Sequence, residues 1–166
     1  MRSFPILAAA LVLALFSPRA EADELRVAVH GIASSSGTLM VGLYDSNEHF
    51  RSALTNATKV GLLNDRSRLV GIAMRAVAGV QSVVFTNLDP GRYAIIVFHD
   101  ENDNGKLDEN SWGVPIEGYG FSNNAEGFLA APSFDKAAVT LDTANTAISI
   151  TLKYPGSHKS EKPDID

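Results

Sequence analysis

Residues 92–110 read Arg-Tyr-Ala-Ile-Ile-Val-Phe-His-Asp-Glu-Asn-Asp-Asn-Gly-Lys-Leu-Asp-Glu-Asn, and this stretch is the most informative about the fold. Residues 93–98 are apolar at nearly every position, so the two faces of this segment do not differ in polarity. A short apolar run bounded by polar turn residues is typical of a strand that is covered on both faces. We therefore predict a central strand over residues 92–99, with the polar second half of the stretch forming a loop at its end.

The loop carries side-chain oxygens at alternating positions, namely Asp100, Asn102, Asn104 and Asp108. This spacing is typical of a calcium-wrapping loop, in which a tightly wound chain points each oxygen inward. Gly105 falls where such a loop makes a left-handed turn that a side chain would obstruct. A hard divalent cation is therefore the first ligand to consider.

The match fails at its last position. Ser111 stands where an EF-hand loop has a bidentate glutamate, so Asn110, Glu109 or Glu117 must complete the ligand shell. Lys106 would contribute its main-chain carbonyl. We predict a weak calcium site of the extracellular class, with a dissociation constant of about 10⁻⁴–10⁻³ M. The predicted ligands are Asp100, Asn102, Asn104, Lys106, Asp108 and Glu117.

An ion-free acidic turn is the alternative interpretation of this loop. Asp103-Asn104-Gly105 after an apolar run is also a strong signal for a tight hairpin. A plain hairpin explains Gly105, but it leaves three further oxygen donors at residues 100, 102 and 108 unexplained. The calcium motif has a known false-positive risk, so both interpretations stay open at the level of sequence.

The two ends of the chain differ from the middle. Residues 1–22 have the pattern of a secretory signal peptide with cleavage after Ala22, and the apolar stretch 6–16 is shorter than the ~20 residues that span a bilayer. Residues 155–166 are polar, charged and interrupted by Pro and Gly, which predicts a disordered tail. We expect one domain over residues 23–154, exported to the periplasm or secreted, with no transmembrane segment.

Composition excludes several classes of function. The chain has a net charge of −5, which argues against nucleic acid as a partner. It has no cysteine, so disulfides, thiol nucleophiles and thiolate metal sites are excluded. About 130 residues remain between the predicted signal and tail, which is enough for one domain with its own core.

Alternating apolar residues predict an all-β fold. Strands are expected at 25–30, 38–44, 69–77, 81–85, 92–99, 137–141 and 147–152, the first two forming an opening hairpin. The polar residues 45–47 are suited to cap one short helix carrying Phe50 and Leu54. Together these elements predict a single antiparallel β-sandwich of prealbumin-like or immunoglobulin-like type, with at most one short helix.

A long loop rich in glycine and aromatic residues is expected over residues 111–124. Its glycines and prolines argue against a regular element there. Trp112, Tyr119 and Phe121 either cap the open end of the sandwich or line a ligand surface. We take these three as candidate ligand-binding residues, and the identity of the ligand stays open.

Five short stretches resemble an exported bacterial family catalogued as domain of unknown function 2141. They are residues 90–94, 99–102, 104–108, 113–115 and 117–123. The resemblance covers about residues 25–154 and implies a signal-bearing β-sandwich, without supplying an activity or catalytic residues. The loop is more weakly similar to prealbumin-like B-repeats of bacterial surface adhesins, a likeness that implies a module stiffened by calcium.

Three functions follow as hypotheses. The first is a non-enzymatic envelope module in which the calcium loop 100–108 orders the aromatic loop for binding an unknown protein, peptide or carbohydrate. The second is a purely structural envelope protein. The third is a metal-assisted hydrolase using His99, Asp100 and Glu117, which is disfavoured because adjacent strand residues point to opposite faces. Oligomeric state is not predicted.

Overall fold

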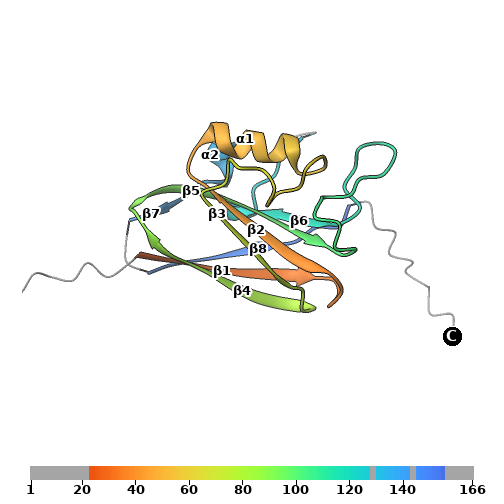
Figure 1. Ribbon diagram of the computed structural model, residues 1–166. Helices are drawn as coiled ribbons and strands as arrows, with labels where there is room; N and C mark the ends of the chain where they lie inside the picture. The colour runs from red at the N-terminus through yellow and green to blue at the C-terminus, as the bar shows by residue number, and fades with distance from the viewer. Residues whose placement is uncertain (1–22, 128–129, 143–144, 156–166) are drawn as a thin grey trace, which may run out of the picture.

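Two β-sheets pack face to face in the computed structural model, which describes residues 23–127, 130–142 and 145–155 (Figure 1). The predicted signal peptide and nearly all of the predicted tail lie outside these residues. The first sheet has three strands in the order β4 (Gly79–Leu88), β1 (Asp23–Ile32) and β8 (Asn145–Thr151). β4 and β8 therefore form its two edges.

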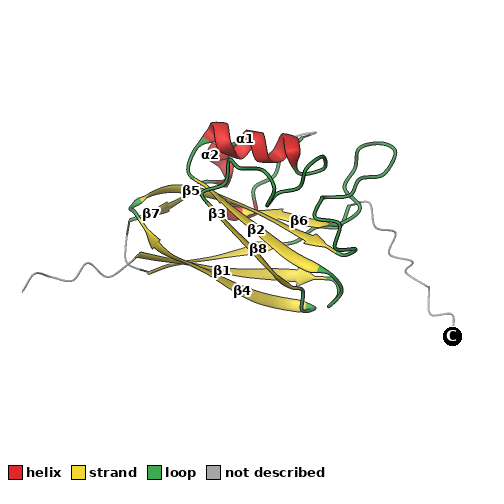
Figure 2. Ribbon diagram, viewed as in Figure 1, coloured by secondary structure: helices red, strands yellow, loops and turns green. Residues whose placement is uncertain are grey.

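The second sheet has five strands. Its order is β3 (Val70–Arg75), β2 (Thr38–Tyr44), β5 (Gly91–Asp100) and β6 (Gly118–Phe121), and β7 (Val139–Leu141) pairs with the start of β5. Figure 2 shows the helices on the outer face of this sheet, away from the three-stranded one. They are α1 (Asn47–Asn56) and the single turn α2 (Phe134–Ala137), with the 3₁₀ turn η1 (Ser122–Asn124) nearby.

The predicted all-β sandwich is confirmed. Strand pairing is antiparallel as expected except between β1 and β8, which run parallel. The main core lies between the sheets, where β1 contributes Leu25, Val27 and Val29 and β2 contributes Leu39 and Val41. These side chains are at most 1% exposed, so the alternation seen in the sequence corresponds to one buried face per strand.

β5 is covered on both faces, as its continuous apolar sequence predicts. Ile95 and Val97 join the core between the sheets, while Ile96 and Phe98 join a second core under α1 and α2. The strand also lies inside the five-stranded sheet, with β2 on one side and β6 on the other. This position holds the end of β5, and hence the loop that follows it, on a rigid support.

The predicted helix is confirmed as α1. The side chain of its N-cap Ser46 accepts a hydrogen bond from the His49 amide at 3.3 Å, which satisfies one of the free amides at the helix start. Phe50 is fully buried and Leu54 packs against the same outer core. No helix among the described residues is long and apolar enough to cross a membrane.

Two details of the predicted strands are wrong. β1 and β2 do not form a hairpin, because β1 pairs with β4 and β8 whereas β2 pairs with β3 and β5. Both strands alternate toward the same core from opposite sheets, and alternation alone does not distinguish strands that pair from strands that face each other. In addition, residues 118–121 of the expected irregular loop form β6.

Candidate functional site

The acidic loop, residues 100–108, leaves the buried end of β5. Asp100 is fully buried, and its carboxylate accepts hydrogen bonds from the amides of Asn104 at 3.1 Å and Gly105 at 2.7 Å. Gly105 has φ +79°, so the predicted left-handed turn is confirmed. The Asp100 carboxylate therefore stabilises the turn by accepting hydrogen bonds from two of its backbone amides.

Asp108 lies close to the two amide side chains of the loop. The side-chain nitrogen of Asn102 donates to it at 2.6 Å, and that of Asn104 donates to both carboxylate oxygens at 3.0 Å. The two amide oxygens in turn accept bonds from the backbone amides of Asn104 and Lys106. Asp108, Asn102 and Asn104, which the sequence assigned to one ligand set, are thus in direct contact.

Glu117 comes from the chain that returns to this loop. One of its oxygens accepts the Glu101 amide at 2.8 Å and the other accepts the Asp108 amide at 3.0 Å. The side chain is only 4% exposed. Glu117 therefore joins the entry of the acidic loop to its exit, and it brings a third carboxylate next to Asp100 and Asp108.

The three carboxylates are crowded. Burial is the main cause that raises the pKa of Glu117 above its ordinary value; the amides of Asp108 and Glu101 oppose this, and the charges of Asp108 and Asp100 add to it. Among the described residues, none of the three carboxylates has an ion pair with Lys or Arg. Negative charge therefore accumulates here, with no Lys or Arg of the described residues within ion-pair distance of these three carboxylates.

The atoms that the predicted ligands offer are of the type that a hard divalent cation prefers. They are all oxygens, and each amide oxygen that accepts one backbone bond keeps a second lone pair. Within the described residues, however, no three Asp, Glu or His side chains already form a metal-binding cluster. The amide groups of Asn102 and Asn104 turn their nitrogens toward Asp108, so ligation would require both groups to rotate.

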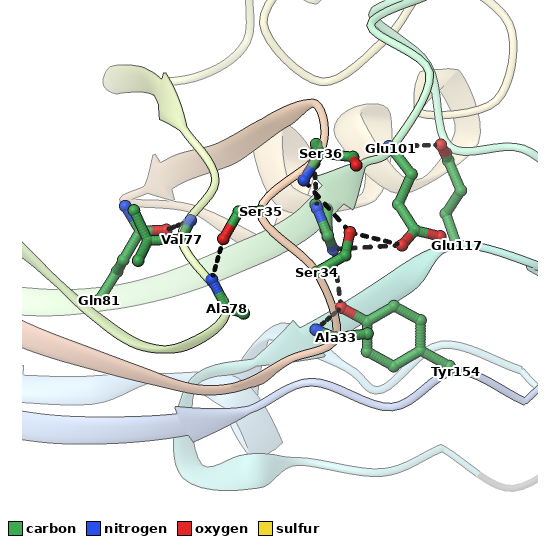
Figure 3. Close-up of polar contacts among 11 residues, drawn as sticks. Ala33, Ser34, Ser35, Ser36, Val77, Ala78, Gln81, Glu101, Glu117 and Tyr154 are labelled. Carbon is green, nitrogen blue, oxygen red and sulfur yellow. Dashed lines mark hydrogen bonds and ion pairs between the residues drawn. The ribbon is translucent and has the colours of Figure 1, made fainter.

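His99 lies at the same end of the sandwich, with Nδ1 3.8 Å from the carboxylate of Glu101 in the acidic loop. It is fully buried, with Nε2 2.7 Å from the Ser36 carbonyl and Nδ1 2.8 Å from the Tyr154 hydroxyl. Since the carbonyl can only accept, Nε2 carries a proton, and in the neutral ring Nδ1 accepts from Tyr154. Figure 3 shows Tyr154, Glu101 and Glu117 gathered beside the loop at residues 33–36 (Figure 3).

The geometry does not assemble the hydrolase arrangement. In the described residues, no hydrogen bond or ion pair joins any two of His99, Asp100 and Glu117, and each is bonded to other groups. His99 is inaccessible to a substrate because its side chain is fully buried. The structure instead uses His99 to hold the loop between β1 and β2.

A groove of about 490 Å³ lies beside the acidic loop, on the outer face of the five-stranded sheet. The sequence did not predict it, because its walls come from segments that are far apart along the chain. Phe98 and Tyr119 belong to the sheet that lines it, Leu54 and Ala57 come from α1 and its end, and Leu107 comes from the acidic loop; residues 113–115, 124–127 and 130–132 also line it. The lining is mainly apolar, as is usual for ligand sites.

The three candidate aromatic residues lie in different surroundings. Phe121 is buried in the outer core and contacts Phe50, with ring centroids 6.2 Å apart. Tyr119 is half-buried next to it, and both rings line the groove. Trp112 is 90% exposed and does not line the groove. The separation arises because residues 118–121 pair as β6 while residue 112 stays in the preceding loop.

The acidic loop and the end of α1 are joined directly. The Leu107 amide donates to the Ala57 carbonyl at 3.1 Å. Gly61, with φ +89°, packs so closely on the loop that a Cβ there would lie 1.8 Å from the Gly105 carbonyl oxygen. The acidic loop and the helical wall of the groove are therefore in direct contact.

The fold and these residues define a β-sandwich module with an acidic loop beside an apolar groove. The chain belongs to the bacterial family described as an uncharacterized protein conserved in bacteria, DUF2141, whose model matches residues 27–149. This confirms the family resemblance drawn from the sequence.

No curated protein matches the chain. Among solved structures, a fimbrial assembly protein from Parabacteroides distasonis is similar at 6% identity with a TM-score of 0.35, covering 79% of this chain. The match spans about half of that protein, 52% of its chain.

Proposed function

We propose that this protein is an exported, non-enzymatic binding module whose groove takes an apolar segment of a partner in the cell envelope, with calcium at the acidic loop fixing one wall. The observation that carries the proposal is the position of Leu107. It lines the groove, lies between the predicted ligands Lys106 and Asp108, and its amide bonds to the carbonyl of Ala57, which lines the groove at the end of α1. Export is inferred from the signal-like residues 1–22.

The predicted ligands support an ion at this loop by their charge. A bound divalent cation would supply the positive charge that Asp100, Asp108 and Glu117 lack among the described residues. Asp100 and Glu117 already lie at the base of the loop, and Asn102, Asn104 and the Lys106 carbonyl would complete the oxygen shell. Holding these groups together would restrict Leu107 and hence the groove wall.

Calcium titration followed by thermal unfolding tests the ion. We expect added calcium to raise the melting midpoint of the protein and to change the fluorescence of Trp112, which is the single tryptophan of the chain. Asp108→Asn should abolish both responses, because it removes a charged ligand while keeping the side-chain shape. A midpoint that does not respond to millimolar calcium contradicts the ion site.

Asp103→Asn is the matched control. Asp103 belongs to the same loop and has the same charge, but it is not a predicted ligand; it accepts a hydrogen bond from the Thr38 hydroxyl at 2.6 Å. Its φ of +58° is one that asparagine adopts readily. We expect the calcium response of Asp103→Asn to match that of the unchanged protein, and loss of that response would show a nonspecific charge effect.

The groove is tested with the neutral apolar dye Nile red. We expect its fluorescence to rise on binding to the unchanged protein and to stay low with Leu54→Lys, which places an ammonium group in the α1 wall. Thr55→Lys is the control, because Thr55 is the exposed neighbour on the same helix and does not line the groove. Equal dye binding by both variants would place the dye elsewhere and contradict the proposed groove.

A purely structural role is the second candidate, and burial of Phe121 favours it. At 7% exposure, with its ring packed against Phe50, Phe121 contributes to the core whether or not a ligand binds. If calcium stabilises the protein while Leu54→Lys leaves capture of envelope partners unchanged, the acidic loop serves stability alone.

A further inference from the structure

β4 is an unprotected edge strand of the three-stranded sheet. Within the described residues β1 is the strand that pairs with it, so its other side carries free backbone amides and carbonyls. Figure 1 shows β4 along the outer border of the sandwich. The strand is ten residues long, and its register shifts lie near its two ends, so residues 80–85 pair regularly.

The opposite edge of the same sheet is protected. On β8, the Asn124 side chain accepts a bond from the Thr151 amide at 2.8 Å and donates to the Ser149 carbonyl at 3.4 Å. Asn124 therefore occupies the backbone groups that another strand would use. Proteins usually block edges in such ways, or with charged residues and proline.

β4 lacks these devices. Residues 76–88 contain no charged residue and no proline, and Val80 and Val84 on the outer face are 54% and 40% exposed. Gln81 holds the start of the strand, since its side chain bonds to the Val77 amide and the Arg75 carbonyl. The β4 edge is thus uncharged and partly apolar, and it is already extended in the single chain.

We propose that β4 pairs with β4 of a second copy of this chain in antiparallel fashion, which joins the two three-stranded sheets into one continuous sheet. Antiparallel pairing of identical strands is self-complementary and generates a closed two-fold dimer. Each copy has a net charge of −5, so copies repel over most of their surface. The uncharged edge is where two acidic copies meet without like charges opposing each other.

Analytical ultracentrifugation over a wide range of protein concentration tests the dimer. We expect the protein to dimerise as concentration rises, and Val80→Lys with Val84→Lys to raise the dissociation constant at least about tenfold, because like charges would face each other across the new strand pair. An unchanged protein that sediments as a monomer at every concentration overturns the proposal.

The control separates edge pairing from stacking of sheet faces. Ala147→Lys with Ser149→Lys adds the same charge to exposed positions of β8 in the same sheet, at the edge that Asn124 protects. We expect this variant to dimerise like the unchanged protein. If it dissociates as strongly as the β4 variant, the copies stack through their faces and edge pairing is wrong.

Hydrogen exchange gives a second, mutation-independent measurement. In the dimer, the outward amides of β4 become bonded, so their exchange should slow as concentration rises, while exchange in β3 at the edge of the other sheet should not change. Concentration-dependent protection confined to β3, or to residues outside β4, contradicts the proposal. The melting curves of both double variants verify that they are folded.

Discussion

Asp65 and Glu117 are both buried carboxylates, 6% and 4% exposed, yet their surroundings shift their pKa values in opposite directions. Burial pushes the pKa of Asp65 up, but hydrogen bonds from Ser67, Asn56 and Ser52 outweigh it and hold that pKa below its ordinary value. Glu117 accepts two backbone amides and still has a raised pKa.

The difference lies in the neighbours. The Asp65 carboxylate accepts hydrogen bonds from the Ser52 hydroxyl, the Asn56 side-chain amide and the Ser67 backbone amide. The Arg68 guanidinium bonds to the main-chain carbonyl of Asp65. Glu117 lies beside the carboxylates of Asp100 and Asp108. Neutral donors offset the cost of burying the Asp65 carboxylate, whereas the charges near Glu117 add to the cost of burying its carboxylate.

The largest effect should come from Asp65→Ala. It leaves the donors of Ser52, Asn56 and Ser67 without their acceptor, and we expect a loss of about 3 kcal/mol in the free energy of unfolding. Urea unfolding measures it, and the loss should be equal with and without calcium. Asp45→Ala, at an exposed ion pair with His49, should lose no more than about 0.5 kcal/mol. Equal losses of unfolding free energy in both variants would contradict the stabilising role of the hydrogen bonds to Asp65.

Asp100→Ala should have the next largest effect, with a different dependence on calcium. The amides of Asn104 and Gly105 lose their acceptor, which costs about 2 kcal/mol without calcium. If the loop binds the ion, the difference between variant and unchanged protein grows when calcium is added, because only the unchanged protein is stabilised. If the difference does not depend on calcium, Asp100 stabilises the fold as Asp65 does and does not bind the ion.

The opposite pKa shifts predict opposite dependences on pH. For Glu117, whose pKa is raised in the folded state, the contribution to stability is complete below the ordinary value of 4.5 and is lost as pH rises through the raised value. For Asp65, the contribution is present above its ordinary value of 3.8 and is lost as pH falls through the lowered one.

Unfolding free energies measured against pH check these signs. Glu117→Gln should flatten the decrease above pH 4.5, with a change smaller than that from Asp100→Ala, and Asp65→Asn should flatten the decrease at acid pH. Calcium should also weaken the decrease assigned to Glu117, since a bound cation favours the charged carboxylate. An unchanged slope in Glu117→Gln would contradict the assignment.

Trp112→Ala should have the smallest effect. The ring is 90% exposed, so we expect a change within about 0.5 kcal/mol in the free energy of unfolding. A large loss of stability would mean that the ring packs on the sandwich in solution. Retained stability with reduced capture of an envelope partner would instead extend the binding surface beyond the groove.

The sandwich, the double-sided burial of β5, helix α1 and the left-handed turn at Gly105 were all predictable from the amino-acid sequence. These features depend on local patterns, because side chains alternate along a strand and a positive φ favours glycine. Ser46 likewise identifies the helix start from its capping chemistry.

Which strands pair and which distant residues meet depends on tertiary packing and was not predictable from the sequence. Alternation in residues 25–44 is the same whether two strands pair or face each other, so the predicted hairpin was wrong. The groove joins Leu54, Leu107 and Tyr119, and the Asp65 cluster joins the end of α1 to the loop that follows it. Such contacts depend on how whole elements pack, which no local spacing records.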